Sequence, residues 1–169
     1  VVATSGDRLI AEETVASLVR ELFPRACVVT PNLDEAALLV GRVIPAAEAL
    51  DAAADALLAM GARAVLLKGG HLPGEEVVDL LAHAQGARSR MAAPRIHSHN
   101  LHGTGCTLSS AIAAHLALGH GLDEAVSRAR AYVREAITAG AAVQVGAGHG
   151  PLNHGHAPVP TVRRQGSPG

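Results

Sequence analysis

Aromatic residues are almost absent from this chain: of its 169 residues, one is Phe, one is Tyr and none is Trp. The hydrophobic share is nevertheless 49%, and Ala, Leu and Val supply most of it. Small aliphatic side chains bury less area each than aromatic ones. We therefore expect a tightly packed aliphatic core and a modest stability per residue.

The chain also lacks an excess of charge and a long apolar run. Its 14 Lys and Arg residues nearly balance 15 Asp and Glu residues, for a net charge of −1, whereas proteins that track phosphate backbones carry a marked basic excess. The apolar-rich stretch 111–118 is far shorter than the roughly 20 residues that a membrane span needs. We expect no nucleic-acid partner and no membrane partner.

Cysteine is scarce as well. Two cysteines, Cys27 and Cys106, do not make a disulfide framework, and no secretory signal is visible, which favours a reducing, cytoplasmic location. The sequence starts at Val1 without a Met, and we interpret it as a fragment. The tail 156–169 has little to bury and is predicted to be disordered or to begin a linker.

Hydrophobic periodicity and turn residues predict an α/β layered domain over residues 1–155. Helices are expected over 10–23, 32–40, 46–60, about 107–118 and 122–143. Strands buried on both faces are expected over 26–30 and 62–68, which favours a parallel sheet, and a hairpin-type pair over 76–81 and 88–92. Sheets of this class bind ligands at the carboxyl ends of their strands.

A glycine-rich turn, His102-Gly103-Thr104-Gly105-Cys106-Thr107, opens into an apolar helix. Glycines let successive N–H groups converge, and the first turn of a helix adds unpaired donors and a positive dipole end, so the turn predicts an anion site. A thiolate is stabilised at such a position, which makes Cys106 a candidate base or nucleophile. The alternative is a small buried cysteine in a tight turn.

Asn32 and Glu35 stand three residues apart where a predicted strand gives way to a helix. This spacing matches a capping box, which needs no ligand. The same amide and carboxylate at the end of a strand also suit Mg²⁺ and its waters. Both interpretations stay open, because they use different faces of the two residues.

A third candidate segment, Lys68-Gly69-Gly70-His71, follows the second predicted strand. Lys68 could reach a phosphate as a point charge, or its side chain could extend from the strand end into water. Asp79, inside an apolar run, would be costly to bury without a partner, so we expect it to face solvent or to cap a loop.

A second glycine loop, residues 148–154, follows the last predicted helix and would suit the wall of a nucleotide pocket. No G-x-x-x-x-G-K-[ST] phosphate loop is present, which excludes a P-loop kinase. The spacing of His97, His99 and His102 does not favour zinc. A Cys–His hydrolase using His102 and Cys106 stays open, although their spacing does not show that the imidazole reaches the sulfur.

Four segments together resemble the hydroxymethylpyrimidine/phosphomethylpyrimidine kinases of thiamine biosynthesis, members of the ribokinase-like superfamily. They are TPNLDE at 30–35, LLKGGH at 66–71, NLHGTGCTLSSAIA at 100–113 and GHGPLNH at 148–154. Ser5-Gly6-Asp7 resembles a further loop of the family. The resemblance implies a mainly parallel sheet flanked by helices, of which this chain is the C-terminal part, with the N-terminal part missing.

The resemblance also implies ATP-dependent phosphorylation of a small pyrimidine alcohol and then of its monophosphate, with Mg²⁺. Gly103, Thr104, Gly105 and Cys106 would form the anion hole, and Cys106 would be the base. Asn32 and Glu35 would order the magnesium. Residues near the nucleotide would be Lys68, Gly70, Gly148, Gly150 and Asn153.

One departure lies beside the turn, where Leu101 replaces the usual Thr. The substrate half of the family is absent from this chain, so two other functions stay open: a pyridoxal or pyridoxine kinase, and a noncatalytic nucleotide-binding module of a fusion protein. A homodimer is compatible with each of them.

Overall fold

The computed structural model describes residues 11–46, 49–144 and 146–159. The chain forms two compact units, Val1–Arg95 and Ile96–Gly169. The Ser5-Gly6-Asp7 segment and most of the predicted tail lie outside the described residues. The predicted domain end at residue 155 stays a prediction.

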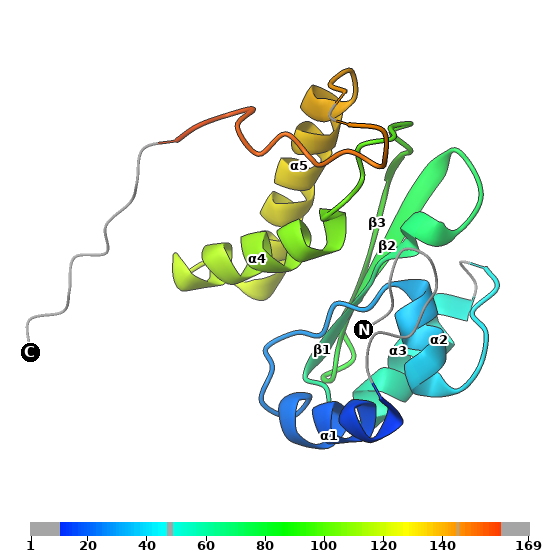
Figure 1. Ribbon diagram of the computed structural model, residues 1–169. Coiled ribbons are helices and arrows are strands. Elements are labelled where there is room, and N and C mark those ends of the chain that lie inside the picture. Colours follow the sequence, from blue (N-terminus) through cyan, green and yellow to red (C-terminus); the bar gives the residue numbers. More distant parts are fainter. Residues whose placement is uncertain (1–10, 47–48, 145, 160–169) are drawn as a thin grey trace, which may run out of the picture. The chain divides into compact units, whose positions relative to one another are not determined.

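In its described residues the first unit contains three α-helices and three strands (Figure 1). They are α1 (Glu12–Leu22), α2 (Leu33–Val40), α3 (Leu50–Ala59), β1 (Ala64–Leu67), β2 (Glu76–His83) and β3 (Arg88–Pro94), with a short 3-10 helix at Gly69–His71 between β1 and β2. The three predicted helices of this part are confirmed with slightly shorter bounds. The predicted hairpin pair is confirmed and longer than expected.

The strands form one antiparallel sheet in the order β1-β2-β3. The link between β2 and β3 is too short for a crossover, so these two strands must run antiparallel. Parallel pairing, which the sequence favoured, is confined in the described residues to three isolated bridges: Val29 with Val65 and Asn32 with Lys68 in the first unit, and His102 with Pro151 in the second.

The segment 26–30 is not the strand that we predicted. It pairs with β1 through two hydrogen bonds, from the Val29 N–H to the Ala64 carbonyl at 3.0 Å and from the Leu66 N–H to the Val29 carbonyl at 2.8 Å. The prediction that both faces of this segment are buried is wrong, because Cys27 is exposed. The apolar run therefore marks a bridge that delivers Asn32 to the end of β1.

The core of the first unit lies between the sheet and α3, with α2 packed on α3 (Figure 1). Leu50 and Leu57 of α3 are fully buried, as are Leu67 and Leu80 of the sheet. Phe23, the single Phe of the chain, closes this core. Truncating one such buried leucine to Ala typically costs about 2–5 kcal/mol, so this packing determines how well the strand ends are held.

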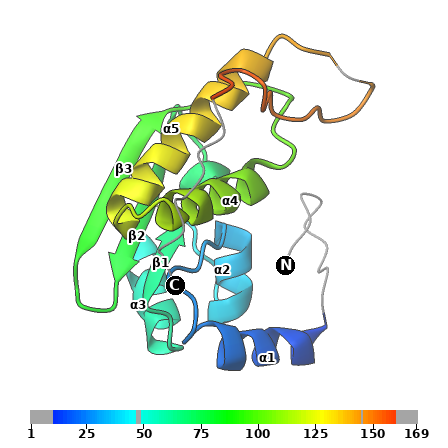
Figure 2. The same ribbon diagram turned by 90° about the vertical axis from the view of Figure 1, so that its left-hand side faces the viewer.

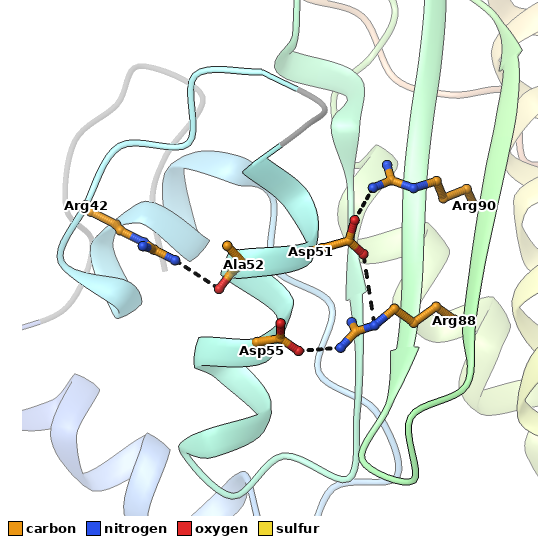
Figure 3. Close-up of polar contacts among 6 residues, drawn as sticks. All are labelled: Arg42, Asp51, Ala52, Asp55, Arg88 and Arg90. Atoms are coloured by element: carbon orange, nitrogen blue, oxygen red, sulfur yellow. Dashed lines mark hydrogen bonds and ion pairs between the residues drawn. The ribbon is translucent and has the colours of Figure 1, made fainter.

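Ion pairs join α3 to the outer strand β3 (Figure 3). The Arg88 guanidinium contacts Asp51 and Asp55, and the Arg90 guanidinium contacts Asp51. These groups are partly exposed, and such pairs contribute about 0–1 kcal/mol each.

Within the part that the structure describes, the second unit contains two helices, α4 (Thr104–Ala117) and α5 (Leu122–Gly140), which lie side by side (Figure 2). Both predicted helices are confirmed. However, α4 begins three residues earlier than predicted, and α5 ends three residues earlier. Their contact buries Ile112, Val126 and Ala129. In the described part of the chain, no helix has the length and apolarity to cross a membrane.

Candidate active site

Asn32 and Glu35 form a complete capping box at the start of α2. The Glu35 N–H donates to Asn32 Oδ1 at 2.7 Å, and the Asn32 N–H donates to Glu35 Oε2 at 2.9 Å. The capping interpretation is therefore confirmed. The role of the two residues toward magnesium stays a prediction.

Lys68 lies beside this box. Its N–H donates to the Pro31 carbonyl at 3.1 Å, and the residue bridges to Asn32. Burial by itself raises the pKa of the Glu35 carboxyl, but the Asn32 N–H and the charge of Lys68 lower it, and the net pKa lies below its usual value. The bridge thus brings together three of the predicted site residues around an ionised carboxylate.

The segment after Lys68 is held by two groups that we had not assigned to the site. The Gly69 N–H donates to Asp79 Oδ1 at 2.9 Å, and the Gly70 carbonyl accepts from Arg95 Nη1 at 2.8 Å. Of the two alternatives for Asp79, its hydrogen bond to the Gly69 N–H confirms that it caps a loop. The alternative that it faces solvent is wrong, because only 8% of its surface is exposed.

In the second unit the glycine turn is the beginning of α4 itself. Gly103 is the N-cap with φ = 85°, a left-handed conformation that favours glycine. The first intrahelical hydrogen bond runs from the Thr107 N–H to the Gly103 carbonyl at 2.8 Å. The N–H groups of Thr104, Gly105 and Cys106 thus belong to the first helical turn, which is a favourable place for an anion.

Thr104 departs from the predicted cradle. Its N–H and its hydroxyl both donate to the Leu101 carbonyl, at 3.3 and 2.6 Å. In this structure Thr104 therefore braces the turn, while the amides of Gly105 and Cys106 point along the first turn of the helix. Cys106 is exposed, which contradicts the alternative of a buried structural cysteine.

The second glycine loop lies against this turn. The His102 N–H donates to the Gly150 carbonyl at 3.2 Å, and His102 bridges to Pro151. The loop is fastened to α5 by the Asn153 N–H, which donates to the Ala136 carbonyl at 3.2 Å. The structure thus brings the predicted anion turn and the predicted nucleotide loop together within one unit.

Asn100 is a structural residue beside the glycine turn that our sequence reasoning did not single out. It is buried, with 6% of its surface exposed, and its Nδ2 donates to the Gly140 carbonyl at 2.6 Å and the Val143 carbonyl at 2.5 Å. A Cβ added at Gly150 would lie 1.9 Å from Asn100 Oδ1. One amide thus joins the end of α5, the turn and the glycine loop. An asparagine just before a glycine turn was the available signal.

The geometry does not support the alternative of a Cys–His hydrolase. Among the described residues, no hydrogen bond joins the His102 ring to the Cys106 thiol, and no group of three or more His, Cys, Asp or Glu side chains could hold a metal ion directly. A cavity of about 430 Å³ lies along α5, lined by Ile96, Arg134, Glu135, Thr138 and Ala139. None of the predicted site residues lines it.

The predicted site residues therefore fall into two sets. The first unit holds Asn32, Glu35, Lys68 and Gly70 around the end of β1. The second unit holds the start of α4 and the loop 148–153. Each set combines groups of the kinds that bind phosphate oxygens or the waters of a magnesium ion. Such groups are typical of nucleotide-binding sites.

Solved structures place the fold in the class of small-molecule kinases. The chain is 32% identical to the pyridoxal kinase from Staphylococcus aureus in complex with AMP-PCP, with a TM-score of 0.83, over 92% of this chain and 56% of that one. It is 36% identical to the phosphomethylpyrimidine kinase from Clostridium difficile 630, with a TM-score of 0.65, over 80% of this chain and 54% of that one. The α/β fold class is confirmed.

The family description "Phosphomethylpyrimidine kinase" matches residues 1–153. The chain belongs to this family. It is 53% identical over 92% of its length to the hydroxymethylpyrimidine/phosphomethylpyrimidine kinase of Rhizobium meliloti, and 41% identical over 92% to that of Escherichia coli. In both cases it spans 58% of the relative's length.

Proposed function

We propose that the protein containing this chain transfers the γ-phosphoryl group of ATP to hydroxymethylpyrimidine and then to the monophosphate, in thiamine diphosphate biosynthesis. The observation that carries this proposal is the family match over residues 1–153, which includes both glycine segments, the capping box and the Lys68 segment. Phosphoryl transfer needs positioning and charge stabilisation more than covalent chemistry, and both units supply groups of that kind.

In the proposed reaction Cys106 acts as the general base and accepts the proton of the substrate hydroxyl. The resulting oxygen forms a bond to the γ-phosphorus, the bond from that phosphorus to the bridging oxygen breaks, and ADP leaves with the electron pair. The N–H groups at the start of α4 stabilise the charge on the transferred group. Gly103, Thr104 and Gly105 give the turn its shape.

Lys68 and Gly70 are proposed to contact the phosphate groups, and Gly148, Gly150 and Asn153 to lie near the nucleotide. Asn32 and Glu35 fit Mg²⁺ as groups that contact its waters, because Mg²⁺ keeps several waters and prefers oxygen donors, and the lowered pKa of Glu35 keeps its carboxylate charged. The ion would neutralise charge on the phosphates.

The experiment is a phosphoryl-transfer assay on the protein translated from the complete reading frame. We expect ADP to form only when ATP, Mg²⁺ and hydroxymethylpyrimidine are all present. ATP binding without ADP formation would favour the noncatalytic module, and absence of ATP binding would overturn both.

A second candidate is a pyridoxal kinase, because several of the matched solved structures bear that name. Competition between hydroxymethylpyrimidine and pyridoxal in one assay separates the two. We expect the pyrimidine to be preferred, since the curated relatives at 37–53% identity are named for it or for thiamine biosynthesis.

We also propose a cytoplasmic location, which the two unpaired cysteines support. A homodimer stays a prediction. Sedimentation of the complete protein would measure the oligomeric state.

A further inference from the structure

One arginine fork holds most of the backbone between β1 and β2. The Arg95 guanidinium donates from Nε to the Gly74 carbonyl at 2.6 Å, from Nη1 to the Gly70 carbonyl at 2.8 Å and from Nη2 to the Leu72 carbonyl at 2.5 Å. Three alternate carbonyls therefore turn toward one cation. Hydrogen bonds from a charged donor are stronger than neutral ones and fix geometry as well.

The same segment is anchored at its beginning by Asp79. The buried carboxylate accepts the Gly69 N–H at 2.9 Å, and the Leu72 N–H donates to the Gly69 carbonyl at 3.0 Å. Gly69 also has no room for a side chain, because a Cβ there would lie 1.9 Å from the Val78 carbonyl oxygen. The segment is thus pressed onto β2 at one end and held by Arg95 over the rest of its length.

Arg95 is not placed as a direct phosphate ligand. Each of its three guanidinium nitrogens donates to a carbonyl of the segment 70–74. We propose that Arg95 is a positioning residue: with Asp79 it fixes the backbone of residues 69–74, so that Lys68 and Gly70 are preorganised for the phosphate groups of the nucleotide. The inference rests on the proposed function of Lys68 and Gly70.

Arg88, at the beginning of the strand that Arg95 follows, offers a matched control. Its guanidinium contacts Asp51 and Asp55 of α3 and not the segment 69–74 (Figure 3). A general effect of replacing a guanidinium with an ammonium group would follow from Arg88→Lys as well as from Arg95→Lys. An effect of lost segment geometry would follow only from substitution of Arg95.

The test compares Arg95→Lys, Arg95→Met and Arg88→Lys in the protein translated from the complete reading frame. KM for ATP, KM for the pyrimidine and kcat are measured separately, and thermal unfolding checks that each variant folds. Lysine keeps the charge but cannot bond three carbonyls in one plane. Losing two charged hydrogen bonds should raise the KM for ATP about tenfold in Arg95→Lys, with kcat changed less than about threefold.

A larger rise is expected for Arg95→Met, and none for Arg88→Lys. If Arg95→Met does not fold, Arg95→Lys decides alone. The inference is overturned if folded Arg95→Lys binds ATP as the wild type does, or if Arg88→Lys weakens ATP binding equally. Should the wild type bind ATP but transfer no phosphoryl group, the proposed reaction fails, and the Kd for ATP of the same variants still decides the role of Arg95.

Discussion

The two units hold their functional groups in different ways. In the first unit, side chains hold the backbone: the capping box fixes the start of α2, and Arg95 and Asp79 fix the segment after Lys68. In the second unit, the groups that we propose to bind the phosphate are backbone N–H groups at the start of α4, and the buried amide of Asn100 joins the surrounding segments.

The cores of the two units also differ in the size of their buried side chains. The first unit buries leucines between a sheet and a helix, whereas the buried residues of α5 include several alanines, among them Ala125, Ala129 and Ala136. A small-residue contact lets two helices approach closely but leaves less apolar area to stabilise each of them. We therefore expect burial of apolar side chains to stabilise the first unit more than the second.

The largest expected effect is on kcat, and it should differ between substitutions of the two cysteines, of which each unit contains one. Cys106→Ala should lower kcat at least about 10²-fold, or about 2.7 kcal/mol, because a general base is lost. Cys27→Ala is the matched control, since Cys27 is equally free and exposed. Steady-state kinetics of the complete protein measure both. Turnover that survives in Cys106→Ala would remove this residue from the mechanism.

A smaller effect tests the pressed segment of the first unit. Gly69→Ala puts a Cβ against the Val78 carbonyl oxygen, which belongs to the sheet and cannot yield easily. The free energy of unfolding should fall by about 2–3 kcal/mol. For Gly70→Ala, whose Cβ would meet nothing within 4 Å, we expect less than about 1 kcal/mol. Urea unfolding gives both values, and equal losses would contradict the close approach.

The corresponding test in the second unit is a double-mutant cycle. Gly150→Ala collides with the Oδ1 of Asn100, so the amide must turn away from the Gly140 and Val143 carbonyls, at a cost of about 1–2 kcal/mol. Asn100→Ala removes the collision together with those bonds. The double variant should therefore cost less than the two single variants added. Strict additivity in urea unfolding would show that the amide and the loop are independent.

The smallest expected effect is a pH dependence in the second unit. Burial lowers the pKa of His115 below its usual 6.5, and the charges of His120 and Arg128 lower it further, against Glu124. Nδ1 of His115 is buried without a hydrogen-bond partner among the described residues. The unfolded state then binds a proton more readily, so the contribution of His115 to stability is present above pH 6.5 and is lost as the pH falls below it.

His115→Leu should flatten this part of the pH profile. The measurement is the thermal midpoint between pH 5 and pH 8, recorded for the wild type and for the variant. A profile that keeps its slope in the variant would assign the dependence to other groups.

Much of the local structure was accessible to sequence reasoning. The spacing of Asn32 and Glu35 predicted the capping box, and the apolar periodicity predicted five helices within a few residues of their bounds. The segment 26–30 was overestimated, because a short β-branched run does not show whether both of its edges are paired. The start of α4 was placed too late, because glycine and threonine weaken a helical pattern that a left-handed N-cap nonetheless supports.

By itself, the sequence determined the local elements and, through four ordered motifs, the kinase family. Only the tertiary structure decided which polar side chains hold the backbone of those motifs in place. Arg95 lies outside the four motifs and Asn100 begins one of them, but their hydrogen-bond partners stand 21 to 25 and 40 to 43 residues away along the chain. Hydrogen bonds between such distant residues form only once the chain has folded, so local sequence patterns cannot predict which residues are paired.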